Sequence, residues 1–470
     1  MRFRSKPLAA LLAATALTAC TVGPDHVSPA VPPAAQAGFI GAKGDRISDA
    51  APVANWWQLY DDPVLDGLVA DGLAANTDVR VAIARIERAR ASLRGSRAEA
   101  LPQTGVNASG SYGRVSEGEV LPGMDREGRR VAGEFAVGYE VDLFGRVARG
   151  IEASQADYEA ARQDADAVRV TVVADIVQAY VDAASSAEQI AVATRSLDLL
   201  SRSERITNAR FERGLNQKLD VIRLTQLREE QAASIPAMVA QRDAALFRLA
   251  TLTGRAPQDL PDAVRARGDT PDVGKVIPVG DGQILLARRP DVKAAERRLA
   301  ADTARIGVAT ADLYPRITLG GAVSTNSVGD TAVLGSGPLG WLVGPMLSWA
   351  FPNQEAVRSR IEQSRADASA DLALFDGTVL RALEETETAL SAYRNALLRK
   401  ERLQASRDAA RRAADVSLAR QSRGQIDALD ALDAQRTLAQ SDAQYAAATR
   451  SVAFAEVDLF RALGGSWSES

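Results

Sequence analysis

Four short stretches of the chain alternate apolar and polar residues with a period of two. In residues 134–144, EFAVGYEVDLF, the large apolar side chains fall on one face and the acidic ones on the other. Residues 104–112 alternate more weakly, and residues 316–325 and 340–349 repeat the pattern later in the chain. Because successive side chains of a strand point to opposite faces, each stretch is predicted to be a strand. Their length of about ten residues suits a transmembrane strand, although period two also fits a half-buried strand of a soluble sheet.

Helical stretches separate these strands, and two of them are longer than the helices of compact domains. After Gly145, residues 146–212 contain one glycine and no proline, and residues 355–423 are similar. One helix over residues 145–212 would reach about 100 Å at 1.5 Å per residue. The apolar spacing within both stretches predicts packed helical seams. Each long helix is followed by a glycine and a return helix, and Pro236 is predicted to kink the first return helix.

The second half of the chain repeats the first. Residues 77–102 align with residues 290–315 at an offset of 213. Gly214 and Gly424 each precede an aspartate by six residues and a second glycine by 40. These equal spacings predict a tandem duplication in which each copy contains a helix, two strands and a long helix pair.

The N-terminus resembles an export signal with a lipid attachment site. The segment MRFRSKPLAALLAATALTAC begins with basic residues and continues with an apolar run too short to span a bilayer. Its end, LTAC, resembles the lipobox of bacterial lipoproteins, in which the cysteine is acylated, and Thr21 after Cys20 points to the outer membrane. The predicted domains are a signal peptide at 1–19, a lipidated tether at 20–55, a first structural repeat at 56–265 and a second at 266–470.

The composition argues against several functions. A net charge of −4 and the lack of a basic, aromatic-rich patch disfavour nucleic-acid binding. His26 is the only histidine and Cys20 the only cysteine, so we expect no catalytic site, no metal site and no cofactor apart from the covalent lipid. The chain is therefore not expected to be an enzyme.

Four strands per chain cannot close a barrel, and an open sheet edge cannot face lipid. Two chains would give eight strands, whose interior side chains nearly fill, whereas three give twelve and leave a lumen. If the strands are transmembrane, a trimer is the smallest channel.

Several motifs in this order resemble one family, the outer-membrane efflux lipoproteins of the OprM and NodT type, which are relatives of TolC. The motifs are CTVGPD (20–25), WWQLYDDPVLDGLVADGLAANTDVRVAIARI (56–86), YEVDLFGR (139–146), LARRPDVKAAERRLAADTARIGVATADLYP (286–315), GPMLSWAF (344–351) and LDAQRTLAQSD (432–442). The resemblance implies a mostly α-helical, TolC-like fold. Four strands per chain would complete a trimeric twelve-strand transmembrane β-barrel above a long periplasmic coiled-coil barrel.

The resemblance also implies the function. The chain would be the lipid-anchored outer-membrane subunit of a tripartite efflux system, a passive exit duct for small molecules and drugs. Its partners would be a periplasmic adaptor (membrane fusion) protein and an inner-membrane pump, commonly of the RND class. A type I-like protein secretion duct and, with less support, a soluble periplasmic coiled-coil adaptor are the alternatives.

The segment GQIDALDALDAQ (424–435) supplies the candidate aperture. By the resemblance, the loop at Gly424 lies near the periplasmic tip, where the pore closes. In a trimer each carboxylate becomes a ring that favours cations. We predict that Asp430 and Asp433 line the aperture, with Asp427 as a flanking contributor that a helix dipole also explains. Asp430 and Asp433 are expected to lie deeper in the helix than its first turn.

The first copy offers a possible partner for these carboxylates. At positions corresponding to Asp430 and Asp433 it has Asp220 and Arg223, which could form an ion-pair latch between neighbouring coils. Elsewhere, Trp56 and Trp57 are expected to anchor the waist by packing. Trp341 and Trp349 either belong to a membrane-interface girdle, which their positions near the ends of a strand favour, or fill core. The turn at 351–354, FPNQ, departs from the family's usual acidic-glycine turn and leaves the start of the following helix open.

Overall fold

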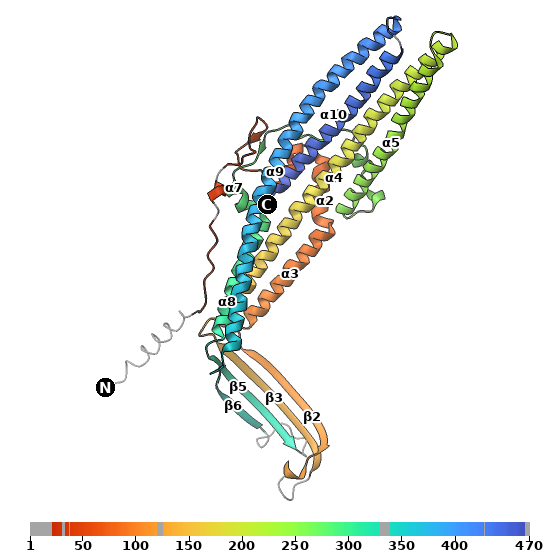
Figure 1. Cartoon of the computed structure of the whole chain (residues 1–470). Coiled ribbons are helices and arrows are strands. Elements are labelled where there is room, and N and C mark those ends of the chain that lie inside the picture. The colour runs from red at the N-terminus through yellow and green to blue at the C-terminus, as the bar shows by residue number, and fades with distance from the viewer. Residues whose placement is uncertain are drawn as a thin grey trace. The chain divides into compact units, whose positions relative to one another are not determined.

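The computed structural model describes residues 21–30, 33–36, 38–119, 126–328, 339–426 and 428–465. Helices and strands follow the same order twice along the chain (Figure 1). In each copy two helices precede two strands, and a very long helix and a shorter return helix follow. The predicted duplication is therefore present in the order of the elements, while the boundaries at 265 and 266 stay a prediction.

The first copy consists of α2 (Pro63–Ala75), α3 (Thr77–Ala98), β2 (Gln103–Arg114), β3 (Glu127–Val141), α4 (Arg146–Glu212) and α5 (Lys218–Leu252). The second consists of α7 (Gly282–Arg288), α8 (Pro290–Ala311), β5 (Arg316–Val328), β6 (Leu339–Ser348), α9 (Glu355–Ser422) and α10 (Ala428–Ala462). The shorter elements are η2 (Pro33–Gln36), β1 (Ile47–Ser48), η3 (Trp56–Tyr60), η4 (Glu117–Glu119), η5 (Pro257–Asp259), α6 (Asp262–Arg265) and β4 (Ile277–Pro278).

The chain divides into two compact units, and each draws on both copies. The first unit contains the described residues up to Pro29 together with those of Arg85–Arg162 and Ala294–Asp376, and so holds all four long strands. The second contains Ala30–Ala84, Gln163–Lys293 and the chain from Gly377 onward. The sequence repeat and the compact unit are thus different divisions of the same chain.

The four long strands form one antiparallel sheet with the order β2-β3-β5-β6. This confirms the strand prediction, but β3 differs from it at both ends. The strand begins at Glu127 and ends at Val141, so Leu143 lies beyond it. Residues 127–133 pair with β2 although their own sequence does not alternate, because the ladder with β2 continues to Arg114.

The second unit has a core built from helix seams and from aromatic side chains near residue 56. Figure 1 shows α5 returning beside α4 and α10 beside α9. Val172 and Ile176 of α4 are buried in this core. Trp56 and Trp57 are buried as predicted, at 2% and 7% exposure. The Trp56 ring stacks on Phe460, with the two ring centroids 4.7 Å apart.

A polar side chain, which we call the clamp, donates a hydrogen bond to the last turn of each return helix. In the first copy Asn76 Nδ2 donates a hydrogen bond to the Leu252 carbonyl at 3.0 Å. In the second copy Arg289 Nη1 donates to the Ala462 carbonyl at 3.1 Å. Both contacts satisfy a carbonyl that has no partner within its own helix. The two copies thus fill the same position with different side chains.

The Arg289 clamp makes ion pairs as well as the hydrogen bond to the return helix. Its guanidinium bonds both oxygens of Asp291, at 2.9 and 2.6 Å, and pairs with Glu385 at 2.7 Å. Burial lowers the pKa of Arg289, but the bonds to these two carboxylates outweigh burial and leave the pKa raised. The arginine therefore stays charged and joins the start of α8 to α9 and α10.

Replacing Arg289 with alanine should lower the free energy of unfolding by about 2–3 kcal/mol, because a carbonyl and two carboxylates lose a charged donor. Chemical denaturation of the detergent-solubilised protein measures this loss. Arg399→Ala, at an exposed position of α9, is the matched control and should change stability by less than about 0.5 kcal/mol. Equal losses in the two variants would contradict the clamp.

Candidate functional site

One face of the sheet carries a continuous apolar surface. Phe135 on β3 lies between Val106 on β2 and Val323 on β5, and Val323 is paired with Trp341 on β6. The same face continues through the rows Val137–Gly321–Val343, Tyr139–Leu319–Pro345 and Val141–Ile317–Leu347. Phe135 is 47% exposed and Trp341 76% exposed. An exposed apolar surface of this kind marks contact with lipid or with another protein.

The opposite face is polar and small. Asn107, Glu134 and Ser324 form one cross-strand row, and Gly138 and Gly320 are paired in another. This alternation, apolar on one side and polar on the other, is the pattern of strands with lipid on one face and water on the other.

The apolar rows extend over most of the length of the apolar band of an outer-membrane barrel. From Phe135 to Val141 they extend about 20 Å at 3.3 Å per residue, against an apolar band of about 25 Å in outer-membrane barrels. Trp341 lies in the row at one end, and Trp349 lies just beyond the other end of β6. The interface girdle stays a prediction for these two residues.

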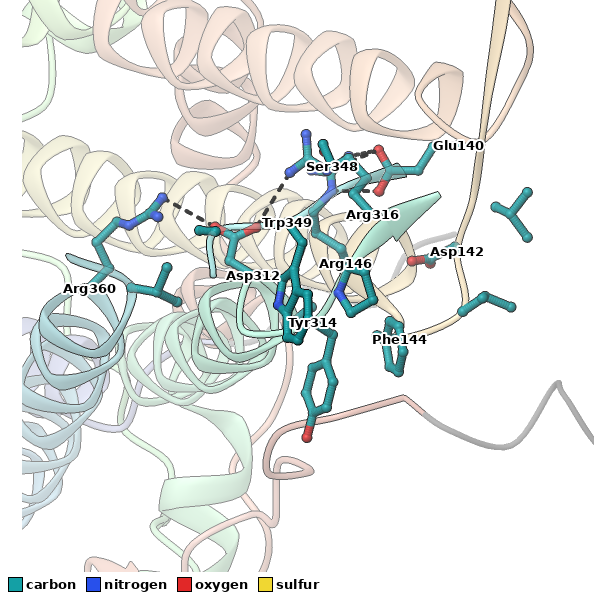
Figure 2. Close-up of a pocket in the computed structure, with 16 residues that line it drawn as sticks. Glu140, Asp142, Phe144, Arg146, Asp312, Tyr314, Arg316, Ser348, Trp349 and Arg360 are labelled. Carbon is teal, nitrogen blue, oxygen red and sulfur yellow. Dashed lines mark hydrogen bonds and ion pairs between the residues drawn. The ribbon is translucent and has the colours of Figure 1, made fainter. Parts of the chain in front are cut away.

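A network of ion pairs joins the ends of the strands to the starts of the helices (Figure 2). Arg146, the first residue of α4, donates to both oxygens of Glu140, at 2.8 and 2.9 Å. Arg316 lies 3.8 Å from the same carboxylate and 3.4 Å from Asp312, which also pairs with Arg360 at 3.2 Å. The network therefore links β3, α4, the turn after α8, β5 and α9 around a pocket of about 420 Å³.

Aromatic stacks lie beside this network. Phe144 stacks on Tyr314 with ring centroids 4.5 Å apart, and Trp349 stacks on Phe351 at 4.6 Å. Trp349 Nε1 also donates to the Leu313 carbonyl at 2.9 Å. Two apolar stacks and a charged network thus fix the direction in which each strand leads into its helix.

The atypical turn at 351–354 has a well-defined structure. The Phe351–Pro352 peptide is cis. The Asn353 side chain accepts a hydrogen bond from the Glu355 amide at 3.3 Å, and Gln354 Nε2 donates to the Leu313 carbonyl at 2.9 Å. Helix α9 begins at Glu355, so the departure from the family pattern does not prevent the long helix from starting at the expected position.

The predicted lipid attachment site, Cys20, lies outside the described residues, but the residues after it are docked. The Val22 amide donates to the Phe144 carbonyl at 3.2 Å, and Arg149 Nη2 donates to Asp25 at 2.6 Å. Burial lowers the pKa of Arg149, but its bonds to Asp25 and Glu152 outweigh burial and raise it. The chain that follows residue 20 is therefore held where β3 leads into α4.

The two helix tips have the same backbone structure. Gly214 and Gly424 both have a positive φ, of 72° and 73°, which favours glycine. In the first tip the Leu215 amide donates to the Arg210 carbonyl at 2.9 Å. In the second, residues 425 and 420 make the equivalent bond at 3.0 Å. These bonds satisfy carbonyls at the helix ends.

The predicted aperture residues have different local roles. Asp220 forms a capping box with Gln217 at the start of α5. Asp430 is exposed and lies in the first turn of α10, so the expectation that it lies deeper is wrong: α10 starts only at Ala428. Asp433 is exposed and pairs with Arg436 at 2.8 Å.

Two further residues belong to the predicted aperture and latch. Arg223 is exposed on α5, and Asp427 lies outside the described residues. Asp220 lines a small pocket together with Leu429 and Leu432, so the first tip lies next to the first turns of α10. The latch between the copies stays a prediction.

Sequence reasoning did not identify the charged network at the strand ends. Its one local signal is the motif YEVDLFGR, which contains both Glu140 and Arg146. Their partners Asp312, Arg316 and Arg360 come from the second copy, and only the sheet pairing brings them together.

Among the residues that the structure describes, no group of three or more histidine, cysteine, aspartate or glutamate side chains is arranged to hold a metal ion. None of the helices in the described ranges combines the length and the apolar character needed to cross a bilayer.

Comparison with known proteins identifies relatives along the whole chain. The family model described as "Outer membrane efflux protein" matches twice, at residues 68–255 and 282–465, as a tandem duplication requires. The outer membrane protein OprJ of Pseudomonas aeruginosa is 32% identical over 478 residues, covering 100% of this chain and 98% of OprJ. The toluene efflux pump outer membrane protein TtgI of Pseudomonas putida is 29% identical over 489 residues, covering all of both chains.

Solved structures agree with these matches. The outer-membrane channel OprN is 34% identical, with a TM-score of 0.87 over 95% of this chain and 100% of OprN. The open state of the Neisseria gonorrhoeae MtrE outer membrane channel is 27% identical, with a TM-score of 0.83 over 95% of this chain and 98% of MtrE.

Arg146→Ala should lower the free energy of unfolding by about 1.5–3 kcal/mol, because Glu140 loses a bidentate charged partner in a half-buried site. The folded chain should therefore be lost at a lower temperature. The measurement is the temperature at which the folded form is lost on semi-native gels. Arg146→Lys keeps the charge but not the two parallel hydrogen bonds that a guanidinium donates to a carboxylate. It should therefore recover only part of the loss. Arg358→Ala, at an exposed position of α9, should have no effect; equal behaviour of Arg146→Ala would contradict the role of the network.

Proposed function

This chain belongs to the outer membrane efflux protein family, and from that premise we propose that three copies form a passive exit duct through the outer membrane. The observation that carries the proposal is the open four-stranded sheet with an exposed apolar face. Within the described residues β2 pairs only with β3 and β6 only with β5, so each sheet has two edges. Three sheets joined edge to edge would give twelve strands, with the polar faces around a lumen.

The duct would work as one part of a tripartite efflux system. The chain carries no motif for using an energy source, so a partner must supply the driving force. The partners proposed are a periplasmic adaptor protein and an inner-membrane pump of the RND class. Relatives named for toluene, solvent and pyoverdine export support small organic molecules as the cargo. A type I-like protein secretion duct is the alternative cargo class.

We further propose that Cys20 carries a lipid that anchors the chain in the outer membrane. The support is the lipobox-like LTAC and the docking of the residues that follow it. Because Val22 is bonded to Phe144, just after β3, a lipid on residue 20 would lie near the end of the apolar face of the sheet.

The periplasmic aperture is proposed at the second helix tip. Asp430 and Asp433 would form rings of three carboxylates, with Asp427 beside them. Asp220 and Arg223 of the first tip would supply the latch. The support is the exposure of Asp430 and Asp433 and the pocket that brings Asp220 next to the start of α10.

Cys20→Ser should lose metabolically incorporated lipid but still require detergent and still have the mass of three chains, because the apolar face of the sheet is unchanged. Labelling with a radioactive fatty acid and light scattering in detergent measure these properties. A variant that is soluble and monomeric without detergent would contradict the membrane duct and support a periplasmic adaptor.

Asp430→Ala and Asp433→Ala should each lower the preference of the channel for cations over anions and change its single-channel conductance. The effect should be larger at 0.01 M salt, where the Debye length is about 30 Å, than at 1 M, where it is about 3 Å. Planar-bilayer recordings under a KCl gradient measure both quantities.

The control for this experiment is Asp415→Ala, an exposed aspartate on α9 farther from the tip. It should leave the selectivity unchanged. Channels of normal conductance and selectivity in both Asp430→Ala and Asp433→Ala would contradict the aperture while leaving the duct itself intact.

A further inference from the structure

The second unit buries one carboxyl group that neither the duct nor the aperture uses. Glu456 lies on α10 and is 1% exposed. Tyr393 on α9 donates a hydrogen bond to its Oε1 at 3.3 Å. The backbone of Val273 lies beside the carboxyl and lowers its pKa, against the larger effect of burial. Glu456 Oε2 has no partner of good geometry among the described residues. The hydroxyl of Tyr60, which faces the same carboxyl, also lacks one.

The charges around Glu456 disfavour its ionised form. Asp272, next to Val273, repels a negative charge on it. The nearby cations are directed at Asp272 instead, with Lys400 at 3.5 Å and Arg46 at 4.0 Å. Arg46 stabilises the Glu456 anion only weakly, and none of the ion pairs in the described residues includes Glu456. Burial first, and Asp272 second, raise the pKa of Glu456 from 4.5 to about 8.

The first copy has different residues at the positions equivalent to this buried pair. The residue equivalent to Tyr393 is Tyr180, which donates to Asp62 at 2.8 Å, and Asp62 is paired with Arg267 at 3.3 Å. The position equivalent to Glu456 on α5 is the buried Leu246. A carboxyl at position 456 is therefore not required by the fold.

Glu456 packs against the segment that joins the two copies, residues 266–281, which we call the connector. The connector contains Asp272 and β4, and it is pinned to the chain before η3 by backbone hydrogen bonds. The Ile277 amide donates to the Arg46 carbonyl, and the Val279 amide donates to the Ser48 carbonyl, both at 2.9 Å.

We propose that Glu456 is a proton-controlled lock on the connector: the neutral acid holds the connector against α9 and α10, and loss of the proton releases it. A neutral carboxyl can donate from one oxygen, which gives the Tyr60 hydroxyl or a buried water a partner. The anion would place a second negative charge beside Asp272 in a buried site, where the nearby cations pair with Asp272. The groups that face Glu456 are Tyr393 from α9, Tyr60 from η3, Asp272 and Val273 from the connector and, more distantly, Arg46.

The pH range follows from the two pKa values. A carboxyl with a raised pKa in the closed state contributes stability that is complete below pH 4.5 and is lost as the pH rises to about 8. Between these limits one proton is released on opening, so the opening equilibrium rises about tenfold per pH unit. Above about pH 8 both states are ionised, and the dependence ends.

Hydrogen exchange of the full-length protein in detergent tests the lock. After correction for intrinsic exchange, protection of the Ile277 and Val279 amides should fall about tenfold per pH unit from pH 6 to 8 and then level off. Glu456→Gln and Glu456→Leu, which copies the first repeat, should show protection that does not depend on pH. Asp272→Asn should make the protection level off at a lower pH, because the neighbouring negative charge is removed.

Glu401→Gln, at an exposed position of α9, is the matched control and should behave as the wild type. The same slope in the wild type and in both Glu456 variants would overturn the proposal. So would pH-independent protection in the wild type that instead rises with added Na⁺ or Ca²⁺, because that result would assign a bound cation to the carboxyl. None of these outcomes depends on trimer formation or on the aperture.

Discussion

The unpaired backbone groups along the outer edges of β2 and β6 are the constraint on which the first unit depends. In water these N–H and C=O groups could bond to solvent, but the apolar face of the sheet would then be exposed. In lipid the apolar face is satisfied, and the open edges are not. Only pairing with further strands meets both requirements. The ion pairs around Glu140 and Asp312 fix the ends of the inner strands β3 and β5, against which the edge strands β2 and β6 are paired.

The duplication preserves backbone requirements more closely than side-chain chemistry. Both tips keep a glycine with positive φ and the same closing hydrogen bond. The clamp on the return helix, in contrast, is a neutral amide at Asn76 and a multiply paired guanidinium at Arg289. The buried tyrosines differ in the same way, since Tyr180 contacts an ion pair and Tyr393 a carboxyl without one. A polar group must fill each position, but several groups can do so.

The sequence predicted those features that depend on local pattern. Period two located four strands, and the lack of proline and glycine located the long helices to within a residue or two. It missed the start of β3, because residues 127–133 are held by pairing with β2 and not by their own alternation. It also missed the network of Glu140 and Asp312 and the burial of Glu456. Each depends on residues from segments that are far apart in the sequence. No local spacing in the sequence indicates that these residues lie close together in the fold.

The duplication also separates two reasons for the acidic residues at the second tip. Asp220 and Asp430 occupy equivalent positions in the first turn of their helices. A carboxylate there interacts favourably with the helix dipole, by about 0.3–1 kcal/mol, so a shared helix requirement accounts for both residues. The next equivalent pair, Arg223 and Asp433, lies beyond the first turn and differs in the sign of its charge. The helix dipole therefore explains Asp430 in part but not Asp433, whose counterpart in the first tip carries the opposite charge.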